Sequence, residues 1–453
     1  MESINPYSGK LIKKYQEMSL EDVNDIIQKV HETFLKWRKV PFDDRSELME
    51  NAANVLRENS KKYGKIMAEE MGKPIKDGIS EVNKCAWICD YYADNAESFL
   101  QDEIIETDAS NSYVTYQPLG IILAIMPWNF PFWQVFRFAA PGLMAGSVGV
   151  LKHASNVPGC ALAIEEVFKQ AGFPKNAFRA LLVGSKVVNK IIENPLIKAV
   201  TLTGSVPAGK AVARKSGSVL KKTVLELGGS DPYIIFEDAD LENAAKICAL
   251  SRLINSGQSC ISAKRFIVVD SVRKKFEELF VKEMKSYKMG NPLEESTQIG
   301  PQARYDLRDA LHKQVTESIE KGANCLLGGE IPSDKGAFYP PTVLTDVKRG
   351  MPAYDEELFG PVASIIVVNN KEEAITVAND SIFGLGASIF TKNIVDGNKI
   401  AREEIQAGCC FVNTYVRSDP RLPFGGIKDS GYGRELSHHG IKEFVNIKTI
   451  YIK

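Results

Sequence analysis

The stretch 120–126, GIILAIM, opens the part of the sequence that decides the fold. Apolar runs of this kind alternate with helical stretches, which is typical of parallel strands covered by helices on both faces. A second alternating series starts at 232–236 (PYIIF). The sequence therefore predicts an α/β protein with two lobes, each built on a sheet. The expected strands of the first lobe are 120–126, 147–152, 179–183, 198–203 and 222–227, and those of the second are 232–236, 264–270, 363–369 and 386–390.

Composition excludes several classes of protein. The chain has 453 residues, 44% hydrophobic and 25% charged, with a net charge of −1, which gives no general attraction to nucleic acid or to an anionic membrane. No apolar run reaches the ~18 residues of a membrane span. The opening MESINPYSGKLIKKY lacks the apolar core of a signal peptide, so a cytoplasmic protein is expected. Eight cysteines and five histidines show no metal-ligand spacing, and no metal site is expected.

Two segments have the pattern of exposed strands. SNSYVTYQP (110–118) alternates between polar and apolar residues, and so does the tail, KEFVNIKTIYIK (442–453). Strands of this kind often pair with a sheet edge of another chain. We expect segments 107–118 and 432–453 to join subunits in a homodimer or a homotetramer.

Three segments carry candidate catalytic residues. In PWNFP (127–131), two prolines restrict the backbone around Asn129, whose amide could donate to an oxyanion at the end of a strand. In LELGG (225–229), Glu226 ends an apolar strand, where burial could raise the pKa of a general base. In NSGQSC (255–260), Cys260 lies in a loop of small polar residues. The alternatives are a proline-rich turn, a solvated glutamate and a buried small hydrophobe.

Two further segments suit a nucleotide. In LTGSVPAG (202–209), Gly204 allows a tight turn and Ser205 precedes a helix whose backbone N–H groups favour a phosphate. The alternative is an ordinary helix cap. In EELFGPV (356–362), the carboxylate of Glu357 can take both hydroxyls of a ribose, and Phe359 can lie against a flat ring. The alternative is a charged turn before a strand.

These segments, in this order and together with PFGGIKDSGYGRE (423–435), resemble the aldehyde dehydrogenase superfamily along essentially the whole chain. The resemblance implies a Rossmann-like cofactor domain (1–106 and 119–227), a second α/β catalytic domain (228–420) and a small β extension for oligomerisation. It also implies that Cys260 is the nucleophile, that Glu226 is the general base, and that Asn129 donates to the oxyanion with the backbone N–H of Cys260. The cofactor contacts that it implies are Trp128, Lys152, Ser155, Gly204, Ser205, Glu357 and Phe359.

The segment VLKHAS (150–155) bears on cofactor choice. Many NAD-preferring members of the family have a glutamate three residues after the lysine, and here that residue is Ser155. Loss of the negative charge should admit the 2′-phosphate of NADP beside Lys152, so NADP is expected, with NAD as the alternative. His153 is interpreted as a turn residue, with a ligand contact as the alternative.

Arg137, in WQVFR, indicates the substrate. An aromatic residue is common at the matching position of the family, and an arginine there is a feature of succinate-semialdehyde dehydrogenases, where it can bind a distal carboxylate. RSDPRLPFGG (417–426) resembles the bacterial branch of these enzymes, and Ser418 could donate to the same carboxylate. Ile254 occupies the position of a second tunnel arginine, for which Arg417 or Arg421 could compensate.

The expected function is therefore NAD(P)-dependent oxidation of succinate semialdehyde to succinate, through a thiohemiacetal and a thioester on Cys260. The rival expectations are oxidation of another small aldehyde, such as glutarate semialdehyde, and a catalytically silent protein on the same scaffold. A surface position for Arg137 would weaken the substrate assignment.

Overall fold

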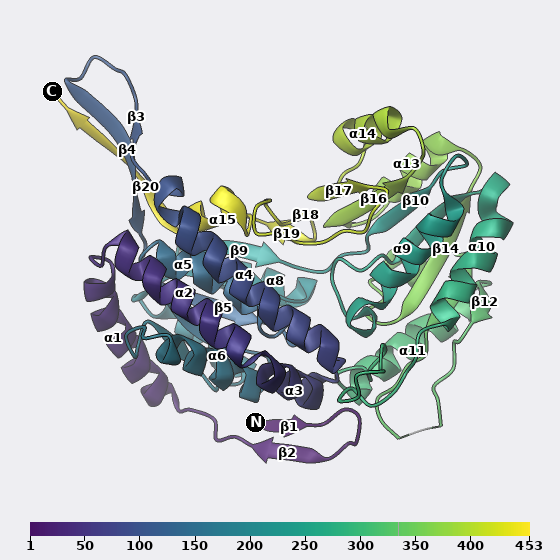
Figure 1. Ribbon diagram of the computed structural model, residues 1–453, viewed down its shortest axis with the longest axis horizontal. Coiled ribbons are helices and arrows are strands. Elements are labelled where there is room, and N and C mark those ends of the chain that lie inside the picture. Colours follow the sequence, from purple (N-terminus) through teal and green to yellow (C-terminus); the bar gives the residue numbers. More distant parts are fainter. Residues whose placement is uncertain (334) are drawn as a thin grey trace.

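The computed structural model describes residues 1–333 and 335–453, and it consists of two α/β lobes side by side (Figure 1). The first lobe contains a six-stranded sheet in the order β19-β9-β8-β5-β6-β7, parallel except for β19. All five strands expected in this lobe are present. The bounds are β5 Ile121–Met126, β6 Val148–His153, β7 Phe178–Ala180, β8 Ile197–Thr203, β9 Lys222–Glu226 and β19 Gly431–Tyr432.

The strand order of this sheet reverses beside β5. From β5 the chain passes outward through β6 to β7, and then returns to place β8 and β9 on the other side of β5. The loops that leave β5 and β8 therefore diverge from neighbouring points at the carboxyl edge. In open α/β sheets, this switch point is where ligands bind.

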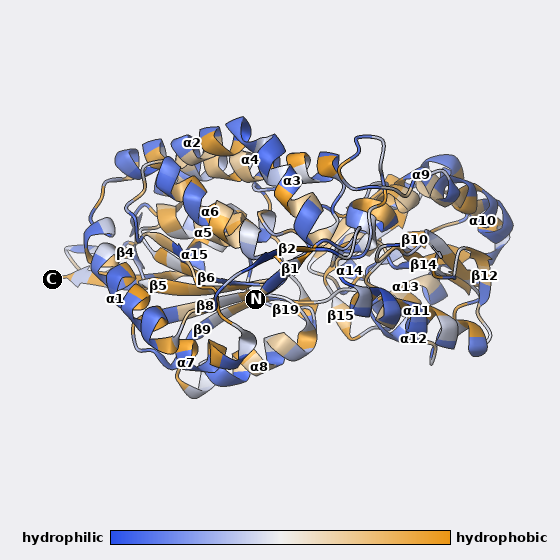
Figure 2. Cartoon of the chain, turned by 90° about the horizontal axis from the view of Figure 1, so that it is seen from below, coloured by the Kyte–Doolittle hydropathy of each residue, from blue (hydrophilic) through white to orange (hydrophobic). Residues whose placement is uncertain are grey.

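Helices cover both faces of the first sheet. In Figure 2 the helices carry both blue and orange segments, as expected for helices that turn one face to a core. Helix α1 begins at a capping box formed by Ser19 and Asp22, and its buried residues include Val23, Ile27 and Val30. The bounds are α1 Leu20–Trp37, α2 Phe42–Glu58, α3 Ser60–Met71, α4 Ile75–Phe99, α5 Trp133–Met144, α6 Pro158–Gln170, α7 Val188–Glu193 and α8 Val206–Ser218.

The second lobe contains a seven-stranded sheet in the order β12-β13-β14-β11-β10-β16-β17, antiparallel only at β12. The sequence predicted four of these strands and missed β12, β13 and β17, each of which has only four residues. The strand bounds are β10 Pro232–Ile235, β11 Arg265–Val269, β12 Asn324–Leu327, β13 Thr342–Thr345, β14 Val362–Val368, β16 Gly386–Phe390 and β17 Cys409–Val412. The helices are α9 Leu241–Leu253, α10 Asp270–Lys285, α11 Tyr305–Glu320, α12 Pro352–Asp355, α13 Lys371–Asn379 and α14 Ile394–Glu403.

A third, three-stranded sheet projects from the first lobe (Figure 1). Its strands are β3 (Glu103–Ile104), β4 (Asn111–Pro118) and β20 (Val445–Ile452), and β20 pairs with β4 along its whole length. Both segments expected to form exposed strands are therefore strands, although the tail segment 432–453 also contains helix α15 (Ser437–Lys442). Two small antiparallel pairs complete the fold, β1 (Glu2–Ile4) with β2 (Leu11–Lys14) and β15 (Phe383–Gly384) with β18 (Ile427–Lys428).

Within the described residues, no helix is long and apolar enough to cross a membrane. The same residues contain no cluster of three or more metal-ligating side chains.

Candidate active site

The carboxyl ends of four adjacent parallel strands hold most of the residues singled out in the sequence. Because the strands are parallel, their carboxyl ends lie at one edge of the sheet. The residues at this edge are Trp128 and Asn129 after β5, Lys152 and Ser155 at the end of β6, Gly204 and Ser205 after β8, and Glu226 at the end of β9.

His153 holds the PWNFP loop after β5 in place. The His153 ring lies between two backbone carbonyls, with Nε2 2.9 Å from the oxygen of Pro131 and Nδ1 3.2 Å from that of Met126. Burial lowers the pKa of His153 to about 4, and the ring is neutral. The interpretation of His153 as a turn residue was wrong, because the residue ends β6 and is buried.

Asn129 is buried and its amide is oriented by two neighbours. Gln134 Nε2 donates to Asn129 Oδ1 at 3.1 Å, and Asn129 Nδ2 donates to the carbonyl of Gln258 at 3.1 Å. Asn129 thus points its N–H groups towards the loop that carries Cys260, two residues after Gln258. Asn129 is also joined to this loop through its own carbonyl, which accepts from Asn255 Nδ2 at 2.8 Å.

The loop before Cys260 has an unusual backbone. Asn255, Ser256 and Gly257 adopt successive left-handed conformations with φ of 53°, 57° and 76°. Strained backbone of this kind persists only where the surroundings hold it, and it is found mainly at functional sites. Here a Cβ on Gly257 would lie 2.2 Å from the carbonyl carbon of Gly360, so this loop passes very close to the segment after EELF.

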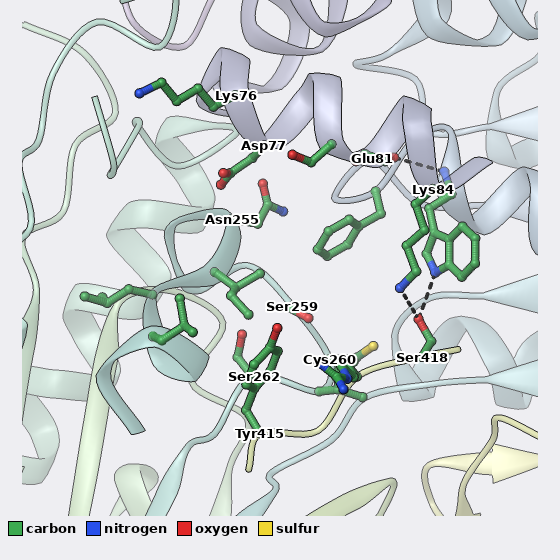
Figure 3. Close-up of a pocket in the computed structure, with 18 of the residues that line it drawn as sticks. Lys76, Asp77, Glu81, Lys84, Asn255, Ser259, Cys260, Ser262, Tyr415 and Ser418 are labelled. Carbon is green, nitrogen blue, oxygen red and sulfur yellow. Dashed lines mark hydrogen bonds between the residues drawn. The ribbon is translucent and has the colours of Figure 1, made fainter. Parts of the chain in front are cut away.

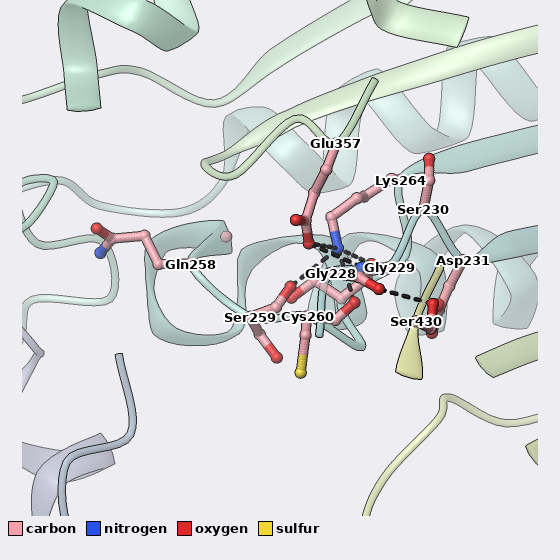
Figure 4. Close-up of polar contacts among 12 residues, drawn as sticks. Gly228, Gly229, Ser230, Asp231, Gln258, Ser259, Cys260, Lys264, Glu357 and Ser430 are labelled. Carbon is pink, nitrogen blue, oxygen red and sulfur yellow. Dashed lines mark hydrogen bonds and ion pairs between the residues drawn. The ribbon is translucent and has the colours of Figure 1, made fainter. Parts of the chain in front are cut away.

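The ammonium of Lys264 binds the backbone of the nucleophile loop (Figure 4). Its ammonium donates to the carbonyls of Ser259 (3.0 Å), Cys260 (2.8 Å) and Ser262 (3.3 Å), and it lies 3.4 Å from a carboxylate oxygen of Glu357. Burial lowers the pKa of Lys264, and Glu357 opposes that change. All of its donors face groups of the protein, so this lysine fixes the curve of the loop.

The two glycines of LELGG, which follow Glu226, pack closely against Cys260 and Glu357. A Cβ on Gly229 would lie 2.7 Å from the Cys260 carbonyl oxygen, and a Cβ on Gly228 would lie 2.5 Å from Glu357 Oε2. The backbone N–H of Gly229 donates to Glu357 Oε1 at 3.1 Å. Only glycine permits these approaches, which explains the residue type at both positions.

The Cys260 thiol is protonated at neutral pH. Burial raises its pKa to about 12, although the positive charges of Arg137 and Lys264 lower it. A reactive cysteine requires a thiolate, so this site needs a base that accepts the thiol proton.

Glu226 is buried beside a second carboxyl group and a cation. Its two oxygens have no hydrogen-bond partner among the described residues. Burial raises the pKa of Glu226 well above its usual value, and Glu435 raises it further, while Arg137 and Arg434 oppose the change. Arg137 Nε lies 2.6 Å from Glu435 Oε2, and both side chains are buried. The alternatives of a solvated Glu226 and a surface Arg137 are therefore wrong.

The groups that suit a dinucleotide lie on the other side of Cys260. The rings of Trp128 and Phe359 meet edge to face with centroids 5.7 Å apart, which joins the two lobes. Lys152 is half-buried, and burial lowers its pKa. The side chain of Ser205 makes no capping bond to α8, so the first N–H groups of the helix keep their capacity for an anion. A cation and open N–H groups at one sheet edge fit the phosphates of a dinucleotide.

A cavity of about 690 Å³ opens between the lobes, with Cys260 in its wall (Figure 3). The residues of the wall that matter here are Lys84, Trp133, Arg137, Cys260, Ser418 and Phe424. Arg137 and Ser418 thus share one cavity with the thiol, as the sequence predicted. Of the two compensating arginines, Arg417 lines the cavity, whereas Arg421 pairs with Asp419 at 2.7 Å.

Sequence reasoning gave no role to Lys84, Lys264 or Glu435. Lys264 and Glu435 lie inside segments that were quoted for other residues, and their buried contacts are visible only in the fold. Lys84 lies on α4, far from any motif, and it reaches the cavity because α4 packs against α5.

Comparisons with known proteins agree with this geometry. The model of the aldehyde dehydrogenase family matches residues 1–450. The chain is 51% identical over 450 residues to a protein from Synechocystis sp. named "Probable succinate-semialdehyde dehydrogenase (NADP+)", covering 99% of both. It is 44% identical to the succinate-semialdehyde dehydrogenase (NAD(P)+) of Escherichia coli, covering 99% of this chain and 97% of that one.

A solved structure of the succinic semialdehyde dehydrogenase from Streptococcus pyogenes, in complex with NADP+, is 40% identical with a TM-score of 0.97. The match covers 100% of this chain and 99% of the Streptococcus pyogenes chain. Family model, sequence relatives and fold agree over the whole length, and the chain belongs to the aldehyde dehydrogenase family.

Proposed function

We propose that this enzyme oxidises succinate semialdehyde to succinate with NADP as the hydride acceptor. The observation that carries the proposal is the cavity, whose wall holds the Cys260 thiol together with two donors for a distal carboxylate, Arg137 and Ser418. The names of the relatives from Synechocystis, Escherichia coli and Streptococcus pyogenes support the same substrate.

The residues of the site suit each step of the chemistry. The Cys260 sulfur attacks the aldehyde carbon, and its proton passes to Glu226. Asn129 Nδ2 and the backbone N–H of Cys260 donate to the oxygen, which becomes an oxyanion. A bound nicotinamide dinucleotide supplies the hydride acceptor, and the carbon remains on Cys260 as a thioester. Glu226 releases that proton to solvent and then takes a proton from water, whose oxygen attacks the thioester. The acid leaves, and the proton on Glu226 returns to the Cys260 sulfur, so the thiol re-forms.

The cofactor side is proposed on the charges at the sheet edge. Lys152, Ser155 and the start of α8 at Gly204 and Ser205 would hold the adenosine side and the phosphates. Trp128, Glu357 and Phe359 would hold the nicotinamide side. Ser155 is exposed and carries no negative charge, which favours NADP over NAD.

We also propose that the β3–β4–β20 sheet joins subunits into a homodimer or a homotetramer. Several large apolar side chains of this sheet are exposed in the single chain, among them Ile104, Ile447 and Ile452. The accompanying domain division is 1–106 with 119–227 for the cofactor, 228–420 for catalysis, and 107–118 with 432–453 for assembly.

The test is a steady-state assay of succinate semialdehyde, glutarate semialdehyde and butanal with NADP and with NAD. We expect the highest kcat/KM for succinate semialdehyde with NADP, and no turnover in Cys260→Ala. A higher kcat/KM for butanal would replace the proposal with a dehydrogenase of uncharged aldehydes. Absence of turnover with every aldehyde would favour a catalytically silent protein.

A further inference from the structure

Two cations lie in the distal wall of the cavity, and they differ in their partners. Arg137 has an acidic neighbour in the protein, because its Nε lies 2.6 Å from the buried carboxyl group of Glu435. Lys84 forms no ion pair with any described residue, and its ammonium contacts a hydroxyl and a ring. Of these two cations, therefore, only Lys84 lacks an acidic partner among the described residues.

Lys84 is held in place before any ligand arrives. Its Nζ donates to Ser418 Oγ at 2.8 Å and lies 4.3 Å from the centre of the Trp133 ring (Figure 3). Cation–π contact with an indole orients an ammonium without consuming its hydrogen-bond donors. An ammonium has three N–H groups, so two remain for a ligand.

Ser418 is prepared by the same contacts. Its Oγ accepts from Lys84 Nζ and also from Trp133 Nε1, at 3.1 Å. Two accepted bonds occupy both lone pairs of the hydroxyl, so its own hydrogen must point to a third group. No described residue accepts that hydrogen. A carboxylate in the cavity would accept from Ser418 and from Lys84 together.

The other cations near the cavity are less suitable. Arg421 is bound to Asp419 through Nε (2.9 Å) and Nη2 (2.7 Å), and this pair also occupies the acidic group nearest to Lys84 on the 417–421 loop. Arg417 lies over the ring of Tyr415 at 5.7 Å. Lys76 lines the cavity but is exposed to solvent, where an ion pair contributes little.

We propose that Lys84, with the hydroxyl of Ser418, is the main binding site for the distal carboxylate of the substrate, and that Arg137, whose Nε faces Glu435, is the second cation of that site. This inference rests on the proposed function, since it names the residue that recognises the charged end of the aldehyde. Substrate preference is then determined by helix α4 as well as by α5.

The test compares Lys84→Met with the wild-type enzyme on succinate semialdehyde and on butanal, an uncharged aldehyde of the same length. Loss of one partner of a partly buried charge pair should lower kcat/KM for succinate semialdehyde about thirtyfold or more, mainly through KM. For butanal, kcat/KM should change by less than about threefold, because the variant wall is apolar. Lys84→Gln keeps a donor to Ser418 without the charge and should give the same split if methionine disturbs the wall.

Lys76→Met is the matched control, since it removes the same charge from the same helix and the same cavity. It should leave both kcat/KM values within about twofold of the wild type. If the wild-type enzyme prefers succinate semialdehyde and Lys84→Met and Lys84→Gln keep that preference, the role of Lys84 is wrong while the proposed function stands. If the wild-type enzyme shows no preference over butanal, the proposed function itself is wrong.

Discussion

Two buried or half-buried lysines, one beside the nucleophile loop and one in the wall of the cavity, have different surroundings. Lys264, beside the nucleophile loop, is 1% exposed and faces three carbonyl oxygens and Glu357. Lys84, at the distal wall, faces one hydroxyl and one aromatic ring. Burial lowers the pKa of both. A lysine whose donors are all used holds the protein itself, whereas one with spare donors is suited to a ligand.

The largest effect is expected from removing Lys264, all of whose donors face groups of the protein. Lys264→Met leaves the carbonyls of Ser259, Cys260 and Ser262 without their donor, at about 1–3 kcal/mol for each buried group left unpaired. The loop should move, and kcat should fall about a hundredfold or more with charged and uncharged aldehydes alike. Urea unfolding and kcat on two aldehydes measure both effects.

Lys274→Met, on the exposed part of α10, is the control for a lost positive charge. A normal kcat in Lys264→Met would mean that the loop keeps its shape without this lysine. The contrast drawn between Lys264 and Lys84 would then be wrong.

The next effect concerns the neighbouring carboxyl groups of Glu226 and Glu435. Arg137 lowers the pKa of Glu226 and Glu435 raises it. Arg137→Met should therefore raise the pKa of Glu226, so that activity is lost at a higher pH as the solution is acidified. Glu435→Gln should move the same acidic limb to lower pH. We expect shifts of about one pH unit in opposite directions, measured as kcat against pH with butanal.

Shifts of the same sign in both variants would contradict this account of Glu226. It would then follow that the acidic limb reports another group, and the assignment of the general base would have to change.

A pH series tests the role of the Lys84 ammonium. Burial and the neighbouring Arg137 lower the pKa of Lys84 to about 8, while Cys85 and Glu81 on α4 and Asp419 on the loop act in the opposite direction. The ammonium is therefore present below about pH 8 and is lost above it. KM for succinate semialdehyde should rise about tenfold between roughly pH 7 and 9, relative to KM for butanal.

The ratio of the two KM values removes pH effects that act on the shared chemistry. In Lys84→Gln the ratio should be independent of pH. A wild-type ratio that stays flat would exclude Lys84 as the titrating cation.

An effect no larger than that of the pH change is expected for Ser418→Ala, which removes one hydrogen bond to the carboxylate and one anchor of Lys84. A hydrogen bond to a charged group contributes about 1.5 kcal/mol at the lower end of its range, so kcat/KM for succinate semialdehyde should fall about tenfold. Thr414→Ala, nearby on the same segment, provides a control for a lost hydroxyl. An equal loss with butanal would show that Ser418 acts on the wall in general.

The sequence predicted the sheet edge well, for a physical reason. Asn129, Ser205 and Glu226 follow apolar strands directly, and parallel strands bring their carboxyl ends together wherever the intervening helices lie. In the second lobe β12, β13 and β17 were missed because each has only four residues, too few to show an alternating or continuous apolar pattern. Lys84 could not be predicted, since its place depends on how α4 packs on α5, and no pattern within α4 distinguishes it from the solvated lysines around it.

A short connection in the C-terminal segment links the candidate active site to the projecting three-stranded sheet. Glu435, which faces Arg137, is separated from β20 only by the short helix α15, and Gly440 of that helix lies so close that a Cβ would be 2.7 Å from the Glu435 carbonyl carbon. The strand that we propose for subunit contact and the carboxyl group that faces Arg137 are therefore connected through fewer than ten residues of backbone, roughly the length of one short helix and its flanks.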